Sequence, residues 1–178
     1  GGYVHRGFAE ALDHVWDEID SCLTVEVPPD CPILYTGHSL GGALAILAAT
    51  RRRPDALYTF GAPRVGDVSF NHYLEGLPFH RVVNDCDVVA MVPTPGPLLW
   101  FKHGGQLHRL APGRSQESTS PDGSALKTAF DAIRSVMSGV ASGRWHEPSP
   151  PLANHAPINY VARLYQSRQE AISGSDVE

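Results

Sequence analysis

The stretch at residues 35–45, with the sequence YTGHSLGGALA, constrains the fold of this chain more than any other. Residues 37–41 within it have the pattern G-x-S-x-G. The residues before the pattern, 33–36, are apolar and β-prone, as in a buried strand, whereas residues 43–49 are rich in helix formers. A strand, a tight turn and a helix in this order predict a nucleophile elbow with Ser39 at its tip.

The glycines of this pattern have a physical reason. A turn this sharp holds Ser39 in a strained backbone conformation, and we expect Gly37 and Gly41 to lie so close to neighbouring backbone that a Cβ atom would clash. The hydroxyl of Ser39 is then exposed at the start of a helix, where the backbone N–H of Leu40 can stabilise an oxyanion. The alternative is a glycine-rich turn with an incidental serine, which the flanking pattern disfavours.

Composition limits the class of protein. With 178 residues, 42% of them apolar, the chain is long enough for one domain with a hydrophobic core. A net charge of −5, with no basic run longer than residues 51–53, argues against nucleic-acid binding, and no stretch is long and apolar enough to span a bilayer. Cys22 and Cys31 either form a disulfide or stay free and buried. The cysteines do not choose between a secreted and a cytoplasmic location.

Strand and helix patterns alternate through the first half of the chain, which predicts an α/β fold with a mainly parallel sheet. The expected strands are at residues 33–36, 56–60 and 80–84, and the expected helices are at residues 8–22, 40–52, 67–74, 125–140 and 158–171. Two β-prone runs within residues 99–110, split by Gly104 and Gly105, predict a hairpin.

Three residue types that form a hydrolytic triad occur in a suggestive order. Ser39 and Asp87 both follow predicted strands, where parallel sheets carry their chemistry, and His155 lies on a loop before the last helix. The order Ser, Asp, His is that of α/β-hydrolases.

Six motifs extend this pattern along most of the chain. They are VHRGF at residues 4–8, GHSLGGALA at 37–45, TFGAPRVG at 59–66, RVVNDCDVV at 81–89, HGG at 103–105 and NHAPINY at 154–160. Together they resemble the class 3 lipases, the fungal triacylglycerol lipase-like family of α/β-hydrolases. The resemblance implies that Ser39 is the nucleophile, Asp87 the acid and His155 the base, with Leu40 donating an oxyanion N–H. It implies no cofactor and no metal.

Two of these assignments have rivals in the sequence. His146 is the main rival of His155 as the base, and chain order and the family motif favour His155. Asp85 is the rival of Asp87, and the spacing from Asn84 in the motif favours Asp87.

Three further histidines invite a functional interpretation. We expect His38, next to the nucleophile, to turn its side chain into the sheet as a hydrogen-bonded structural residue. His103 and His108 have a spacing that allows a metal pair. No cluster of cysteines or carboxylates completes such a site, so a structural role is favoured.

An oxyanion hole needs a second donor, which the family places upstream of its V-H-x-G-F motif, with a lid helix between the two. Gly1 begins almost at that motif. We therefore expect residues 1–178 to be the C-terminal portion of a longer lipase-like domain, lacking its N-terminal strands and lid, with an insert at 111–151. The alternative is a compact variant whose insert forms a cover with Phe130, Ile133 and Met137. A fragment would have an unpaired sheet edge.

The resemblance implies a carboxylic ester hydrolase, foremost a triacylglycerol lipase that works through an acyl-enzyme. A phospholipase A1, a feruloyl-type esterase and a non-catalytic lipase-like binding module are the alternatives. The expected partner is a lipid or another ester, met at a lipid–water interface. Acyl-chain specificity, headgroup specificity and oligomeric state have no signal in the sequence.

Overall fold

Four parallel strands form the sheet of the computed structural model, which describes residues 1–84, 87–93, 100–110, 131 and 154–175. The strands lie in the order β1, β2, β3, β4, and all neighbouring strands are parallel. They are β1 (Leu34–His38), β2 (Ala56–Phe60), β3 (Phe79–Asn84) and β4 (Gln106–Leu110). The expectation of a mainly parallel sheet flanked by helices is confirmed.

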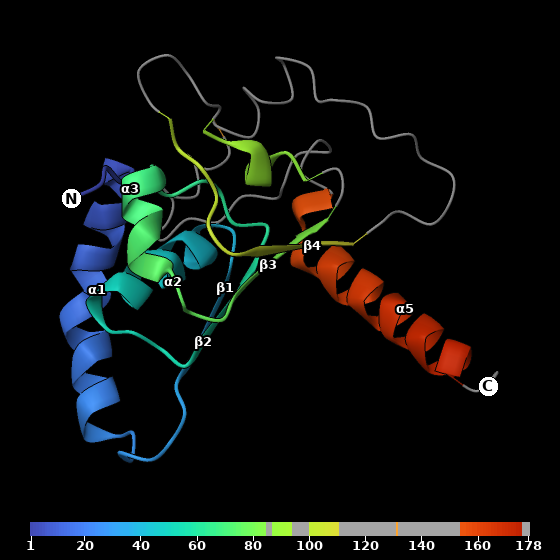
Figure 1. Ribbon diagram of the computed structural model, residues 1–178, viewed down its shortest axis with the longest axis horizontal. Helices are drawn as coiled ribbons and strands as arrows, with labels where there is room; N and C mark the ends of the chain where they lie inside the picture. The colour runs from blue at the N-terminus through green and yellow to red at the C-terminus, as the bar shows by residue number, and fades with distance from the viewer. Residues whose placement is uncertain (85–86, 94–99, 111–130, 132–153, 176–178) are drawn as a thin grey trace.

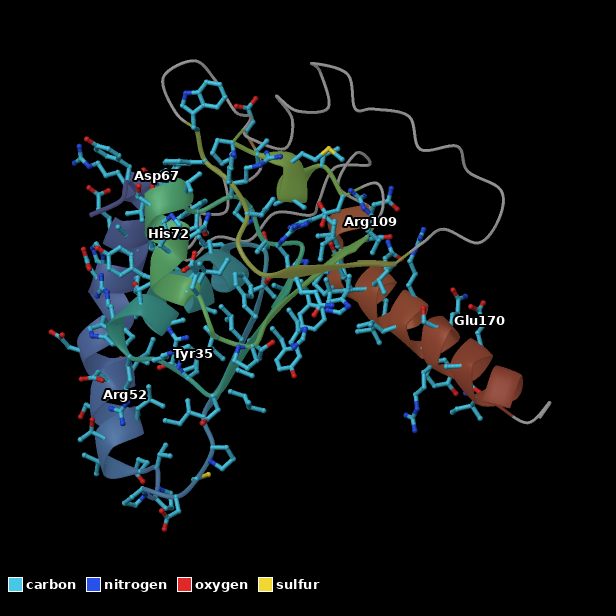
Figure 2. All side chains as sticks on the ribbon, in the orientation of Figure 1. Tyr35, Arg52, Asp67, His72, Arg109 and Glu170 are labelled. Atoms are coloured by element: carbon cyan, nitrogen blue, oxygen red, sulfur yellow. The ribbon has the colours of Figure 1, made fainter. Side chains whose placement is uncertain are left out.

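The connections between strands are the crossovers that parallel pairing requires. Helix α2 (Leu40–Arg51) links β1 to β2. The short helix α3 (Val68–Asn71) and the 3₁₀ turn η1 (His72–Leu74) link β2 to β3, where one short helix was expected. Asp67 caps α3 by accepting a hydrogen bond from the backbone N–H of Phe70 at 2.8 Å (Figure 2).

The helices lie on both sides of the strands. Figure 1 shows α1 (Arg6–Val25), α2 and α3 on one side, and α5 (Pro157–Ser175) on the other. The main core lies between the first group of helices and the sheet, and it includes Phe8, Leu12, Ala43, Leu47, Leu57, Val65, Phe70 and Phe79. A second, smaller cluster joins Phe60, Val82 and Leu110 of the sheet to Tyr160 of α5.

Helix α1 joins this core through one face. Phe8, Leu12 and Trp16 are four residues apart and therefore share a face of the helix. Phe8 and Leu12 are each 1% exposed, and burying such a side chain contributes about 2 kcal/mol. Arg52, just after α2, donates to Asp20 of α1 at 3.2 Å, which ties the two helices together (Figure 2).

The hairpin expected at residues 99–110 is wrong. Strand β4 begins after Gly105 and pairs in parallel with β3, whereas Lys102 forms an isolated antiparallel bridge with Gly66. Gly105 has a φ of +75°, and a Cβ there would lie 2.5 Å from the ring of Phe79. The glycines thus bring the chain close against the start of β3 instead of forming a two-residue hairpin turn.

Other expectations have different outcomes. Cys22 and Cys31 are free and exposed, so both the disulfide and the buried thiols are wrong. Strand β1 is an edge of the described sheet, and its Leu34 is 61% exposed. Among the described helices, none is long and apolar enough to cross a membrane. Apart from residue 131, the helix at 125–140 and the insert at 111–151, with Phe130, Ile133 and Met137, lie outside the described residues.

Candidate active site

The expected strand–turn–helix around Ser39 is confirmed. Strand β1 ends at His38, α2 begins at Leu40, and Ser39 between them has φ 55° and ψ −125°. Within the described part of the chain, Ser39 is the one non-glycine residue with positive φ. Such a conformation costs about 1–3 kcal/mol and is found mainly at functional sites. The side chain of Ser39 makes no capping bond to α2, so the helix does not use the hydroxyl.

The glycines beside Ser39 differ in their importance. A Cβ on Gly37 would lie 2.3 Å from the carbonyl carbon and oxygen of Gly41, so this position requires glycine. A Cβ on Gly41 would meet no such atom within 4 Å, so the clash expected there is wrong. The first N–H groups of a helix have no partner within it, and Leu40 opens α2. The N–H of Leu40 therefore lies in the first turn of α2, at the positive end of the helix dipole.

Asp87 follows β3 and is completely buried, at 0% exposure. A buried carboxylate needs several donors to remain charged. Its Oδ1 accepts from the N–H of Val89 at 2.9 Å, and its Oδ2 accepts from the hydroxyl of Tyr160 at 2.5 Å. His155 Nδ1 lies 2.9 Å from Oδ2 and 3.1 Å from Oδ1. Both oxygens of Asp87 are therefore occupied by donors.

The contact with Asp87 determines which nitrogen of His155 is basic. A carboxylate only accepts hydrogen bonds, so Nδ1 of His155 is the donor. The lone pair of neutral His155 is then on Nε2, which can accept a proton from a hydroxyl. The His155 side chain is 13% exposed, so the ring is largely enclosed but is still reached by solvent.

The carboxyl ends of β1, β2 and β3 meet at this place. His38 at the end of β1 packs against His155, with ring centroids 4.5 Å apart, and Ser39 is the next residue. Gly61 follows β2, with φ +57°, and a Cβ there would lie 2.4 Å from Asp87 Oδ2 and 3.1 Å from His155 Nδ1. Three strand ends thus bring the Ser39 turn, Asp87 and His155 to one site.

Tyr160 and Asn84 belong to the same site, and the sequence interpretation gave neither a role there. Tyr160 is 2% exposed and accepts the backbone N–H of Asn84 at 3.1 Å, besides donating to Asp87. Burial and the neighbouring charge of Asp87 raise the pKa of Tyr160 well above its ordinary value, so its hydroxyl remains a donor. The position of Tyr160 in the last motif was the available signal.

The other histidines have structural contacts. His103 Nε2 donates to the carbonyl of Ala90 at 2.7 Å, and burial together with the charge of Arg81 lowers the pKa of His103 to about 3. His108 instead bonds to His80, with nitrogens 3.0 Å apart. His103 and His108 therefore do not form the metal pair that their spacing allowed, and no group of three metal-ligating side chains occurs in the described ranges. His146, Asp85 and Cys86 lie outside those ranges.

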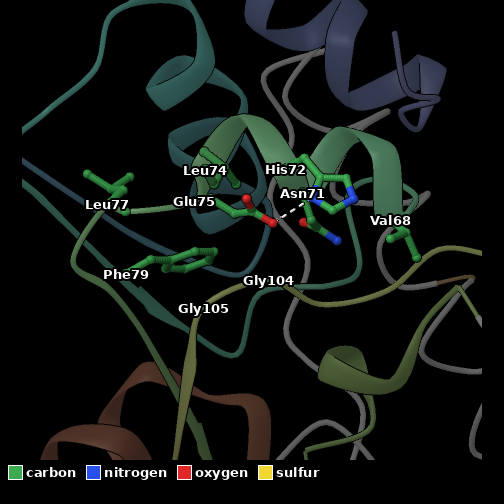
Figure 3. A pocket seen from close by; sticks show the side chains of 10 residues that line it. Val68, Asn71, His72, Leu74, Glu75, Leu77, Phe79, Gly104 and Gly105 are labelled. Atoms are coloured by element: carbon green, nitrogen blue, oxygen red, sulfur yellow. Dashed lines mark hydrogen bonds and ion pairs between the residues drawn. The ribbon is translucent and has the colours of Figure 1, made fainter.

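A separate pocket of about 350 Å³ lies beside α3 and η1, at the start of β3 and β4 (Figure 3). His72 and Glu75 face each other there, with Nδ1 and Oε1 2.5 Å apart. Among the described residues, its lining contains no serine, threonine or cysteine beside His72, so these residues offer no nucleophile. The site at the opposite ends of the strands is therefore the candidate active site.

The chain resembles known proteins over much of its length. Residues 1–96 match the family model described as Lipase (class 3). A lipase of Rhizopus niveus is 36% identical over 126 residues, which cover 58% of this chain and 32% of the relative. A lipase of Rhizomucor miehei is 35% identical over 150 residues, covering 77% of this chain and 40% of the relative. The chloroplastic phospholipase A1-Igamma1 of Arabidopsis thaliana is 42% identical over 96 residues, which cover 46% of this chain and 18% of the relative.

Solved structures resemble the same region. The propeptide complex of Rhizomucor miehei lipase has a TM-score of 0.56 and 34% identity, over 61% of this chain and 39% of that one. Lipase II from Rhizopus niveus has a TM-score of 0.55 and 35% identity, over 65% of this chain and 48% of that one. The chain thus spans 32–40% of the length of the two fungal relatives that it matches in sequence.

Proposed function

Because this chain belongs to the class 3 lipase family and has the α/β-hydrolase fold, we propose that it is a carboxylic ester hydrolase that uses Ser39, Asp87 and His155. The observation that carries the proposal is the buried Asp87–His155 pair beside the strained Ser39 turn. A positive φ at a serine and a fully buried carboxylate are both unfavourable for stability, and a role in hydrolysis explains why the chain has both.

The proposed reaction proceeds through an acyl-enzyme. Nε2 of His155 takes the proton of Ser39 as Oγ attacks the ester carbonyl, and the same nitrogen then protonates the leaving alcohol. Water hydrolyses the acyl-serine by the same route. Asp87 keeps the proton of neutral His155 on Nδ1 and stabilises the imidazolium that forms. The N–H of Leu40 donates to the oxyanion.

The substrate that we propose is a lipid ester, foremost a triacylglycerol, met at a lipid–water interface. The fungal relatives named lipases support this choice. The match to a phospholipase A1 supports a glycerophospholipid as the second candidate. A feruloyl-type ester and a non-catalytic binding role are the remaining alternatives.

The test is the loss of a single hydroxyl. We expect Ser39→Ala to abolish hydrolysis of p-nitrophenyl esters and labelling by a fluorophosphonate probe, while the fold is retained. Ser21→Ala, at an exposed serine of α1, is the matched control and should keep both. Unchanged turnover in Ser39→Ala contradicts the mechanism, and a wild-type chain that never takes up the probe favours the non-catalytic role. Fatty-acid release from triolein emulsions and from phosphatidylcholine vesicles distinguishes the two substrates.

A further inference from the structure

Two side chains outside the proposed triad form hydrogen bonds with the backbone that carries His155. Nδ2 of Asn84 donates to the carbonyl of Asn154 at 2.8 Å. Nε2 of His38 lies 2.7 Å from the carbonyl oxygen of His155 itself. The two carbonyls are consecutive, and the two donors come from the ends of β3 and β1, which are separated in the sheet by β2. We call this pair of bonds the carbonyl clamp.

The clamp is rigid on the side of Asn84. Asn84 is the last residue of β3, is 0% exposed, and its backbone N–H is already bound by Tyr160. A side chain enclosed in this way has little rotational freedom. The carbonyl of Asn154 is therefore held against the end of a strand by a donor that cannot turn away.

The side of His38 is fixed by packing. Its ring lies 4.5 Å from the ring of His155 and 5.6 Å, edge-on, from that of Tyr160. A carbonyl only accepts hydrogen bonds, so the proton of neutral His38 is on Nε2. The titratable groups facing this ring are His155, Asp87 and Tyr160. Burial, and then the proximity of His155, lower the pKa of His38, which keeps the ring neutral while the site works.

These contacts join parts of the chain that are far apart in sequence, by 117 residues for His38 and 70 for Asn84. Asp87 holds only the ring of His155, whereas the clamp holds the backbone from which that ring projects. His38 also precedes Ser39 directly, so the same residue is joined to the nucleophile and to the base. A small displacement of a reacting group costs up to about a hundredfold in rate.

We propose, building on the function proposed above, that His38 and Asn84 are positioning residues that fix the backbone of His155 relative to the Ser39 turn. His38 thus acts through His155 and has no contact of its own with the substrate. The expected structural role of His38 becomes a specific one, because the bond it makes goes to the base and not to the sheet.

His38→Phe tests the clamp, since it keeps an aromatic ring and removes the donor. We expect kcat for p-nitrophenyl butyrate to fall about tenfold, with KM nearly unchanged. His38→Gln, which restores an amide donor, should recover most of that loss. His80→Phe is the matched control, because it also removes one hydrogen bond of a sheet histidine, here to His108, and should leave kcat as it is. Asn84→Leu should show the same lowered kcat wherever thermal unfolding shows it folded.

A second measurement does not depend on hydrolysis. The proton on Nδ1 of His155, bonded to Asp87, should give a low-field ¹H NMR signal in wild type and in His38→Gln. In His38→Phe we expect the signal to broaden through exchange with water, because the ring is less firmly held. The proposed positioning role is overturned if His38→Phe keeps both the NMR signal and the wild-type kcat. It is also overturned if the substitution lowers only the melting temperature or raises only KM. A signal that responds to His38, in a protein whose ester hydrolysis does not need Ser39, supports the clamp and rejects the proposed function.

Discussion

Tyr160→Phe removes one oxygen from the centre of the site, and its cost can be worked out from the contacts. The hydroxyl donates to the fully buried Asp87 and accepts from the N–H of Asn84. A hydrogen bond to a charged group contributes about 1.5–3 kcal/mol, and a neutral one about 1 kcal/mol. We therefore expect the free energy of unfolding to fall by about 3 kcal/mol. For a chain of 178 residues this lowers Tm by about 6–12 °C.

Thermal and urea unfolding of the purified chain measure this loss. Tyr165→Phe is the matched control, because Tyr165 is on the same helix and is 61% exposed. That control should change the free energy of unfolding by less than about 0.5 kcal/mol. Similar values for the two variants would refute the argument, since the buried hydroxyl would then contribute no more than an exposed one.

The pH dependence of the same difference follows from the raised pKa of Tyr160. A tyrosine whose pKa is higher in the folded state contributes stability that is complete below its unfolded value, about 10, and is lost as pH rises further. The difference between wild type and Tyr160→Phe should therefore be constant from pH 7 to 9. It should begin to shrink only above about pH 10. A difference that shrinks already at pH 8 would contradict the assignment.

Three further predictions concern single residues. Gly61→Ala should lower kcat at least about tenfold, because the new Cβ displaces Asp87 or His155, whereas Gly76→Ala, also at positive φ but against only the tip of Arg53, should leave kcat unchanged. Burial lowers the pKa of His103 to about 3 in the folded chain, from about 6.5 when unfolded. The free energy of unfolding should therefore fall by about 1.4 kcal/mol for each unit by which the pH decreases between these values. In His103→Gln, urea titrations should show a smaller fall in the free energy of unfolding over the same pH range. Ser39→Gly should raise the free energy of unfolding by about 1 kcal/mol in urea titrations, because it releases the strain at φ 55°, whereas Ser39→Ala should not.

The fold holds the turn at Ser39 in a strained backbone conformation. Gly37 permits the close approach of α2 to β1, and Ser39, at the tip of this turn, has a strained backbone conformation. The strain persists because α2 is packed in the core through residues such as Ala43 and Leu47, and the partly buried Tyr35 of β1 packs against the same core. We expect variants that loosen this core to relax the turn and to lose activity before they lose the fold.

Much of the fold was predictable because its signals are local. The elements from residue 33 to 60 follow from an apolar strand, a glycine-rich turn, a run of helix formers and a second apolar strand. Each depends on neighbours within a few residues, which periodicity captures. The hairpin expected at residues 99–110 was wrong because the partner of a strand is chosen over long distances. Strand β4 pairs with β3, and Gly105 fits against Phe79.

The sequence by itself determined the Ser39 elbow, since its glycine, its serine and the flanking strand and helix are consecutive residues whose backbone requirements are local. It also singled out Asp87 and His155 through the family motifs, and their catalytic roles remain predictions. Only the tertiary structure decided that these two side chains, 68 residues apart, meet at 2.9 Å, and that Tyr160, Asn84 and His38 surround them. The reason is physical: a buried carboxylate and two backbone carbonyls find their donors only when separate strand ends and α5 come together in the folded chain.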